Sequence, residues 1–445
     1  MFKIKNLFYI LLVCMFLIAT NASCSDQHRF VVKNYDDNDQ KNQKITLRFI
    51  SSWGGVDAKA DTLQKILDQF MEDNPNIKVI NESLYGEDFL PKIKTDFVSG
   101  NDPDVFDIWP GSDIEALIKA NKVADLTDIL INNDEWKNSF NSEMWDYTTY
   151  NKRIYGLPFE KIYEGLFINK GLFEVYNVKV PTTYEELKDA IKIFKQNDVI
   201  PIAYNCSAEG TYIYQNIAAM LGGKDAIQHP IRNGKVNPAY IQAMKYMQEL
   251  YNLGAFPYKP YNLSSKDRDY LFLNKKAAMI VQGSWFIGRV SEEDRQNGLV
   301  DIIPFPAFKE GKASNNSLIY GLGNGVLYIS KAASSDPAKK EAAIKLLKVL
   351  TSKRSAALFA EQTGMYSNVD ITGYNVNYCR LAKKGEVLLK NAKELIGPPD
   401  NFVNRKIWNK IVDDFPRVLG ALVPAMTPEE AWNRAIAELE NESNN

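Results

Sequence analysis

Apolar positions along the chain alternate between the two-residue period of β-strands and the three-to-four-residue period of amphipathic helices. Residues 45–49 alternate apolar with polar side chains and predict a strand, and an apolar helical face follows over 63–70. The order repeats with a strand at 77–80, a second helix and a third strand at 103–109. Strands that alternate with helices of this length predict parallel pairing through helical crossovers, which is an α/β arrangement.

The pattern then restarts and changes character towards the C-terminus. Strand-like segments occur at 153–159, 166–169, 199–204 and 277–281, and the last third of the chain is mostly helical in pattern. A chain of 445 residues exceeds what one hydrophobic core usually supports, so we expect at least two domains.

The first 24 residues have the pattern of an export signal. Lys3 and Lys5 precede an apolar run at 7–18, and small residues lead to Cys24, a candidate lipid-attachment site. The run is shorter than the roughly 20 residues that span a bilayer. We therefore expect a signal peptide and a protein anchored outside the cytoplasm by lipid on Cys24, with secretion or a periplasmic location as the alternative, because Asn21 replaces the apolar residue usual in lipoprotein signals.

Composition and charge exclude some classes of function. The formal net charge is -2, which gives no reason to expect a nucleic-acid partner. After the leader only Cys206 and Cys379 remain, and we expect buried thiols more than a disulfide. The two histidines, His28 and His229, show no metal-ligand spacing, so we expect no metal, no cofactor and no histidine-based catalysis.

Local motifs along the chain resemble, in order, the extracellular solute-binding proteins of ATP-binding cassette sugar importers, the superfamily that includes maltose-binding protein. They are Ile45 to Trp53, Pro103-Asp104-Val105, Ile154 to Phe159, Asn169-Lys170, Pro181 to Leu187, Ala278-Met279-Ile280 with Gly283-Ser284-Trp285, Glu341 to Ser352, and Thr427 to Glu438. Each motif is weak alone, but together they cover nearly the whole chain after the leader.

The resemblance implies a two-lobed α/β fold of the periplasmic-binding-protein type II class, with mixed sheets flanked by helices and a helical C-terminal region. The expected parts are a signal peptide at 1–24, a disordered polar tether at 25–44, a first lobe at 45–156 and 315–367, and a second lobe at 157–314 and 368–440. It also implies a monomer that captures a carbohydrate, expected to be an oligosaccharide, between the lobes and delivers it to membrane permease subunits.

Sugar rings have apolar C–H faces and polar edges, which aromatic side chains and carboxylates can bind. The resemblance assigns ligand-binding positions to Trp285, after the Gly-Ser pair, to Glu160, and to Trp408. Predicted loop tips add Trp53 and Trp109. Further candidates in or near loops are Tyr85, Glu87, Asp107, Glu209 and Tyr212.

Three alternatives remain open at the level of sequence. A secreted glycosidase needs only two carboxylates, for which Glu160 with Asp107 or Glu209 are candidates. The same fold can bind a non-sugar solute such as a polyamine, a metal chelate or an anion. An anchored adhesin would leave the cleft aromatics without a ligand.

Overall fold

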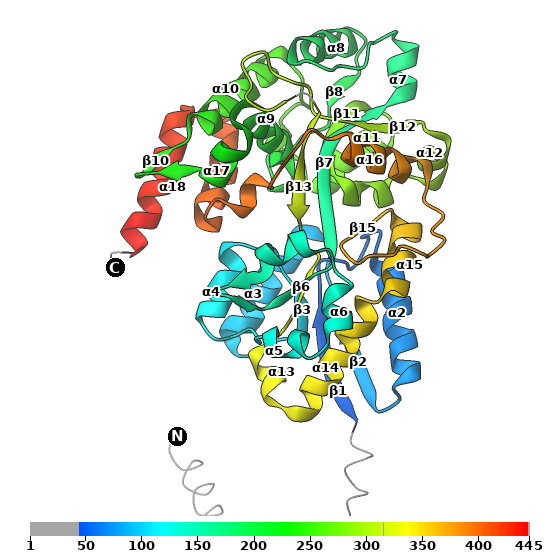
Figure 1. Ribbon diagram of the computed structural model, residues 1–445. Coiled ribbons are helices and arrows are strands. Elements are labelled where there is room, and N and C mark those ends of the chain that lie inside the picture. Colours follow the sequence, from blue (N-terminus) through cyan, green and yellow to red (C-terminus); the bar gives the residue numbers. More distant parts are fainter. Residues whose placement is uncertain (1–43, 315, 444–445) are drawn as a thin grey trace, which may run out of the picture. The chain divides into compact units, whose positions relative to one another are not determined.

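The computed structural model describes residues 44–314 and 316–443, without the side chains of Glu87 and 441–443. The expected signal peptide, Cys24 and almost all of the tether lie outside the described residues. Within them the chain forms two mixed sheets, each flanked by helices (Figure 1). This confirms the predicted two-lobed α/β fold.

The first lobe is built on a five-stranded sheet with the strand order β2-β1-β3-β14-β6. Its strands are β1 (Ile45–Ile50), β2 (Ile77–Asn81), β3 (Val105–Asp107), β6 (Gly156–Pro158) and β14 (Val326–Ile329). β1 pairs in parallel with β2 and β3, as predicted from the alternation of strands and helices. β14 pairs antiparallel with β3 and β6, which makes the sheet mixed.

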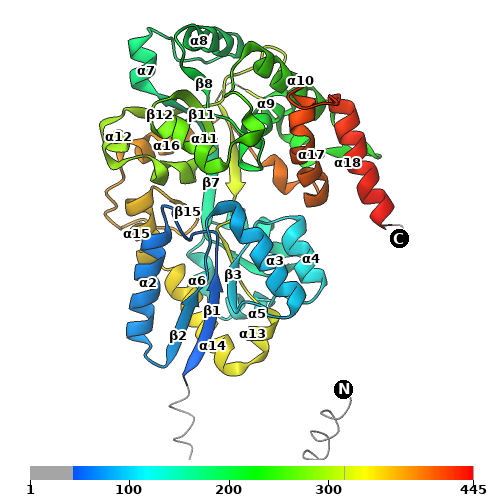
Figure 2. The same cartoon turned by 180° about the vertical axis from the view of Figure 1, so that it is seen from behind.

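Helices cover both faces of this first sheet, because successive strand residues point to opposite faces. Leu47 and Phe49 of β1 pack with α2 (Ala60–Asp73), α14 (Pro337–Leu350) and α15 (Lys353–Thr363). Ile50 packs on the other side with α3 (Phe89–Ser99) and α4 (Ser112–Lys119), and Figures 1 and 2 show α2 and α3 on opposite sides. Shorter helices of this lobe are α5 (Thr127–Ile131), α6 (Asp134–Asn138) and α13 (Lys331–Ser335).

The second lobe is built on a seven-stranded sheet with the order β16-β13-β7-β11-β8, in which β12 and β15 also pair with β7. Its strands are β7 (Glu160–Asn169), β8 (Ile200–Ile202), β11 (Ala277–Gly283), β12 (Val300–Ile303), β13 (Ser317–Leu322), β15 (Tyr366–Ser367) and β16 (Glu394–Ile396). Its helices are α7 (Lys170–Val175), α8 (Tyr184–Gln196), α9 (Tyr212–Gln228), α10 (Pro238–Leu253), α11 (Ser265–Leu273), α12 (Glu292–Asn297), α16 (Arg380–Asn391), α17 (Arg405–Val418) and α18 (Pro428–Ser443).

Strand β7 is the long strand that runs from the second sheet towards the first in both views (Figures 1 and 2). All ten of its residues are buried, including Glu160, Lys161 and Glu164. The sequence predicted a strand only over 166–169, because these charged residues interrupt the apolar run. The preceding strand β6 lies in the first sheet, so the chain passes between the lobes at this point.

The sheet membership of β13 differs from the expected lobe boundary at 315. β13 pairs with β7 through Tyr320 and Tyr163, and it also pairs with β16, so 317–322 belong to the second sheet. The chain returns to the first sheet only at β14. We therefore propose that this crossing lies at Gly323–Gly325 and that the earlier crossing lies between β6 and β7, after residue 158.

Cys206 and Cys379 are both free thiols in the structure, and Cys379 is buried. Within the described residues, no helix has both the length and the apolar character that crossing a bilayer requires.

Candidate functional site

A cavity of about 260 Å³ is lined by side chains of both lobes, and we call it the interlobe cavity. The first lobe contributes loop residues such as Ser52, Lys59 and Trp109, and the second lobe contributes residues such as Trp285 and Arg289. Other lining residues include Gly86, Glu164, Glu209, Tyr212, Asn324, Asp400, Arg405 and Trp408. The cavity therefore lies where strand ends and loops of the two sheets meet, a common position for binding sites.

Aromatic side chains form much of the wall. Trp285 meets Tyr212 edge to face, with ring centroids 5.2 Å apart. Trp109 packs against Phe89 at 6.1 Å, and the guanidinium of Arg405 lies 6.0 Å from its ring. Trp285, Tyr212 and Trp109 are only partly buried, so their rings offer apolar surface to a ligand.

The position of Trp285 depends on the glycine that precedes it by two residues. A Cβ atom at Gly283 would lie 1.9 Å from Cζ3 of Trp285. The indole therefore rests directly on the end of β11, at a place where any other residue would displace it. The Gly-Ser-Trp motif therefore needs glycine at its first position so that the indole at its third position can pack on the backbone.

Two carboxyl groups belong to the cavity wall, Glu164, which is 2% exposed, and Asp400, which is partly buried. Asn216 donates a hydrogen bond to Oε2 of Glu164 over 2.7 Å. Burial raises the pKa of Glu164 well above its usual value, and the nearby Asp400 raises it further. Burial also raises the pKa of Asp400, although the charge of Arg405 opposes this. Both groups have oxygen atoms that accept hydrogen bonds, and burial removes more of the hydration of Glu164 than of Asp400.

Sequence reasoning missed Glu164 and Asp400. Glu160, Ile162 and Glu164 share one face of β7, so the two-residue period of a longer strand would have pointed to Glu164. Asp400 lies in the short turn η7 (Pro399–Asn401), where the sequence offered only a turn signal from Pro398-Pro399.

Asp107 lies behind the cavity wall and holds it in place. The backbone N–H and the hydroxyl of Ser52 donate hydrogen bonds to Asp107 over 3.1 and 3.0 Å. The amide of Asn324 donates in turn to the Ser52 hydroxyl. Burial raises the pKa of Asp107 well above its usual value. Ser52 and Asn324 line the cavity, so Asp107 acts on a ligand only through them.

Glu160 forms a buried ion pair with Lys59 instead of lining the cavity itself. Nζ of Lys59 lies 2.8 Å from Oε2 of Glu160, and both side chains are at most 5% exposed. Burial raises the pKa of Glu160, whereas the charge of Lys59 lowers it. Lys59 lines the cavity, so Glu160 orients a cavity cation that the sequence did not predict.

The structure corrects the expectation that Trp53 lies at a loop tip in contact with ligand. Trp53 is 1% exposed and packs in the core, where its ring centroid lies 5.5 Å from that of Phe359 and 6.2 Å from that of Phe159. The turn that carries it lies close to the neighbouring backbone, because a Cβ at Gly54 would be 2.1 Å from the carbonyl oxygen of Ser83. Trp53 therefore belongs to the hydrophobic core of the first lobe and not to the cavity wall.

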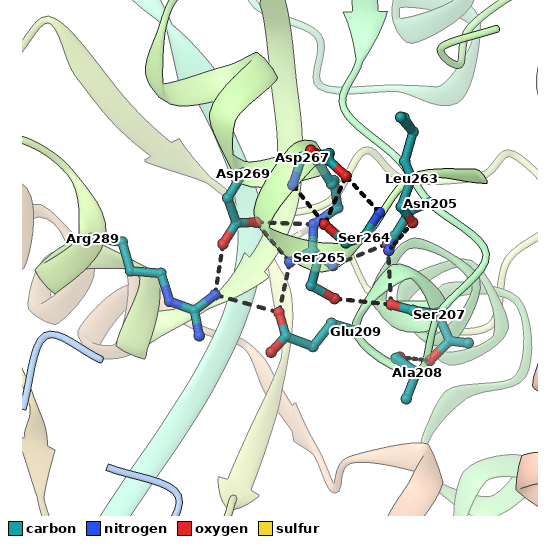
Figure 3. Close-up of polar contacts among 12 residues, drawn as sticks. Asn205, Ser207, Ala208, Glu209, Leu263, Ser264, Ser265, Asp267, Asp269 and Arg289 are labelled. Atoms are coloured by element: carbon teal, nitrogen blue, oxygen red, sulfur yellow. Dashed lines mark hydrogen bonds and ion pairs between the residues drawn. The ribbon is translucent and has the colours of Figure 1, made fainter. Parts of the chain in front are cut away.

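Glu209 belongs to a buried group of four charges, which we call the charge network (Figure 3). Oε2 of Glu209 lies 2.6 Å from Nη2 of Arg268 and 3.3 Å from Nη1 of Arg289. Asp269 pairs with the same two arginines, each at 2.7 Å. Burial raises the pKa of Glu209, but the charges of Arg289 and Arg268 outweigh it and hold this pKa at about 2.

The remaining candidates also differ in whether they line the cavity. Trp408 lines the cavity but is 1% exposed and stacks on Tyr214 at 6.0 Å, so it is mainly a core residue. Tyr85 lies beside the cavity, with Arg289 5.1 Å from its ring, and it is not part of the wall. Glu87 is in the turn η2 (Gly86–Asp88), and its side chain lies outside the described residues.

The structure thus brings five candidates to the cavity wall and places four others behind or beside it. On the wall are Trp285, Trp109, Glu209, Tyr212 and Trp408, and off it are Trp53, Glu160, Asp107 and Tyr85. Over the described ranges, no group of three or more His, Cys, Asp or Glu side chains is arranged to hold a metal ion.

Comparison with known proteins identifies the family. The family model described as bacterial extracellular solute-binding protein matches residues 56–357, which is more than half of the chain. The "Multiple sugar-binding protein" of Streptococcus mutans is 25% identical over 334 residues, covering 73% of this chain and 75% of that protein.

Solved structures show the same fold. One from work on xylan utilization by the thermophilic bacterium Caldanaerobius polysaccharolyticus has a TM-score of 0.77 and 27% identity, covering 89% of this chain and all of that one. A chitin oligosaccharide binding protein also has a TM-score of 0.77, at 22% identity, covering 90% of this chain and 99% of its own. On the match to the family model, this chain belongs to the bacterial extracellular solute-binding proteins.

Proposed function

We propose that this protein is the substrate-binding component of an ATP-binding cassette importer and that it captures an oligosaccharide in the interlobe cavity. The observation that carries the proposal is the cavity wall, where the partly exposed rings of Trp285 and Trp109 accompany the buried Glu164 and the partly buried Asp400. Aromatic faces bind the C–H surface of a sugar ring, and carboxylates accept hydrogen bonds from its hydroxyls. The named sugar specificities of the relatives support the same class of ligand.

The charges of the cavity favour a neutral guest. Lys59 is paired with Glu160, Arg289 with Glu209 and Asp269, and Arg405 with Asp113 at 3.1 Å. A cation that is already neutralised gains little from an anionic ligand. This argues against the anion alternative and for a ligand bound through stacking and hydrogen bonds.

A ligand panel tests the proposal directly. Xylo-, chito- and malto-oligosaccharides, a polyamine and a dicarboxylate should be added to the protein, and the melting temperature and heat of binding measured. A ligand at 100 times its Kd stabilises the folded state by about 2.7 kcal/mol, which is readily measured. Stabilisation by a polyamine or a dicarboxylate with none by any saccharide would refute the carbohydrate assignment.

We further propose that the protein binds without catalysis, as the family description suggests. The glycosidase alternative would now use carboxylates of the cavity wall, such as Glu164 and Asp400. Incubation with each bound oligosaccharide should release no new reducing ends. Release that is lost in Glu164→Gln would favour the enzyme instead.

For localisation we propose a monomer held at the outer face of the cell membrane by lipid on Cys24, next to the permease that receives the ligand. Labelled fatty acid should enter the wild-type protein and not Cys24→Ala. Labelling of neither protein, with the wild type recovered from the medium, would instead support simple secretion.

A further inference from the structure

A second feature of the cavity region is a contact between the lobes that involves no ligand. Tyr85 follows β2 in the first lobe, and Arg289 ends the turn η6 (Ser284–Arg289) in the second lobe. Cζ of Arg289 lies 5.1 Å from the centroid of the Tyr85 ring, and Nζ of Lys266 lies 5.5 Å from it. Two cations of one lobe therefore meet one aromatic ring of the other. Such contacts are strongest where water is excluded.

We propose that Tyr85 and Arg289 form a latch that holds the two lobes closed over the ligand. That the latch retains a ligand rests on the proposed function, whereas the contact that holds the lobes together does not. Arg289 and Gly86 are both part of the cavity wall, so the latch lies at the edge of the cavity. A ligand that fills the cavity and a latch that joins the lobes both stabilise the closed state.

The charge network holds Arg289 in the orientation that the latch needs. Nη1 of Arg289 lies 2.7 Å from Asp269 and 3.3 Å from Glu209, and the side chain is 10% exposed. Arg268, which is 1% exposed, pairs with the same two carboxylates. Figure 3 labels these carboxylates, Glu209 and Asp269, together with Arg289. Two positive and two negative charges balance, so the guanidinium is fixed without leaving a net charge buried.

The loop that carries Tyr85 fits closely against this network. A Cβ at Gly86 would lie 3.6 Å from Oε1 of Glu209, so the loop backbone is in near contact with the network. Nε of Arg289 is buried and, among the described residues, has no hydrogen-bond partner. The loss of hydration at this Nε opposes closure of the lobes, and the contact of the guanidinium with the Tyr85 ring offsets that cost. This balance makes the latch weak enough to release.

Substitution of Tyr85 in the full-length protein tests the latch. Tyr85→Leu removes the ring, Tyr85→Phe keeps it, and Tyr258→Leu is a matched control. Lys259 lies 5.3 Å from the ring of Tyr258, which is 86% exposed and within one lobe. Opening of the lobes is measured without ligand, by hydrogen–deuterium exchange in the peptides 320–326 and 398–404, which line other parts of the cavity. Ligand dissociation is measured by stopped flow with an oligosaccharide from the panel.

We expect Tyr85→Leu to accelerate exchange in both peptides and to speed ligand dissociation about tenfold, with association changed less than about threefold. Tyr85→Phe and Tyr258→Leu should behave like the wild type. The latch is refuted if Tyr85→Leu alters exchange only around residue 85, or if Tyr85→Phe loses as much affinity as Tyr85→Leu.

A second variant protects the test against misfolding of the first. Arg289→Gln removes the cation of the latch and leaves Arg268 to pair with both carboxylates. It should accelerate exchange in the same two peptides, and no acceleration contradicts the latch. If no saccharide binds the wild type, the proposed function fails, while the exchange measurements still decide the latch.

Discussion

At the scale of single residues, the cavity combines partly exposed aromatic rings with a buried acid, the groups to which our proposal assigns binding of sugar faces and hydroxyls. Trp285 rests with its indole on Gly283 and contacts Tyr212 at 5.2 Å, so its orientation is fixed before a ligand arrives. Glu164 is oriented by the amide of Asn216. Preorganised groups of this kind lose little conformational entropy on binding, which favours affinity.

The first residue-level prediction concerns Trp285. Trp285→Ala should weaken saccharide binding by about 2 kcal/mol or more, because a buried stacking anchor carries a large share of the binding energy. Isothermal titration calorimetry measures the change. Trp136→Ala is the control, since the indole N–H of Trp136 donates a hydrogen bond to Thr351 in the first lobe and Trp136 is not part of the cavity wall. Equal affinity of Trp285→Ala and wild type would remove Trp285 from the site.

The second residue-level prediction is a pH dependence caused by Glu164. Burial raises its pKa in the folded state, so the folded chain keeps this proton where the unfolded chain has lost it. The stabilisation is complete below the unfolded pKa of about 4.3 and is lost as pH rises through the folded pKa. Glu164→Gln should therefore raise the free energy of unfolding at pH 8 by about 1 kcal/mol or more, and should weaken saccharide binding.

Urea unfolding at pH 5 and pH 8 measures this effect. The gain from Glu164→Gln should be larger at pH 8 than at pH 5, because the unfolded wild type has lost this proton more completely at pH 8, and that loss favours unfolding of the wild type only. Glu174→Gln, at an exposed position of α7, is the matched control and should change neither value. A gain that is equal at both pH values would show that ionisation of Glu164 is not the cause.

At the scale of elements, the sequence predicted the regular parts of the fold and missed the strand that joins them. β1 and β2 alternate apolar and polar residues, and α2 and α3 carry apolar faces, so their pattern predicts them, whereas β3 is a short segment that is buried throughout. β7 was predicted only in part, since Glu160, Lys161 and Glu164 are charged residues that the interlobe region buries. The prediction for Trp53 was wrong for the opposite reason. The glycines and serines around it are typical of an exposed loop, but the turn that they form packs inward and buries the indole.

The element-level prediction concerns the end of β11. Gly283→Ala should displace Trp285 and weaken saccharide binding at least tenfold, because the new Cβ would lie 1.9 Å from the indole. Calorimetry measures the affinity, and near-ultraviolet circular dichroism reports the ring environment. Gly171→Ala is the control, since nothing lies within 4 Å of its Cβ position and a helical alanine is stabilising by about 0.5 to 1 kcal/mol. Unchanged binding by Gly283→Ala would contradict the role of the glycine.

At the scale of the whole molecule, the cations Lys59, Arg289 and Arg405 in the cavity wall between the two lobes are already paired. Each of these cations has a carboxylate partner: Lys59 and Arg405 pair across the lobes with Glu160 and Asp113, at 2.8 and 3.1 Å, whereas Arg289 pairs with Asp269 of its own lobe at 2.7 Å. These pairs would have been difficult to predict, since Lys59 and Glu160 are far apart in sequence and neither follows an apolar period. Their consequence is a cavity that is polar without attracting ions strongly.

The molecule-level prediction is that saccharide affinity depends little on salt. Mobile ions screen the attraction between a protein and a charged ligand, but they leave stacking and hydrogen bonding to a neutral ligand almost unchanged. Between 0.05 and 0.5 M sodium chloride, roughly the range over which screening becomes strong, Kd should change less than about twofold. The measurement is calorimetry at both salt concentrations with one oligosaccharide. An increase of Kd by about tenfold or more would show that a net charge of the cavity contributes to binding, and would favour a charged solute as the natural ligand.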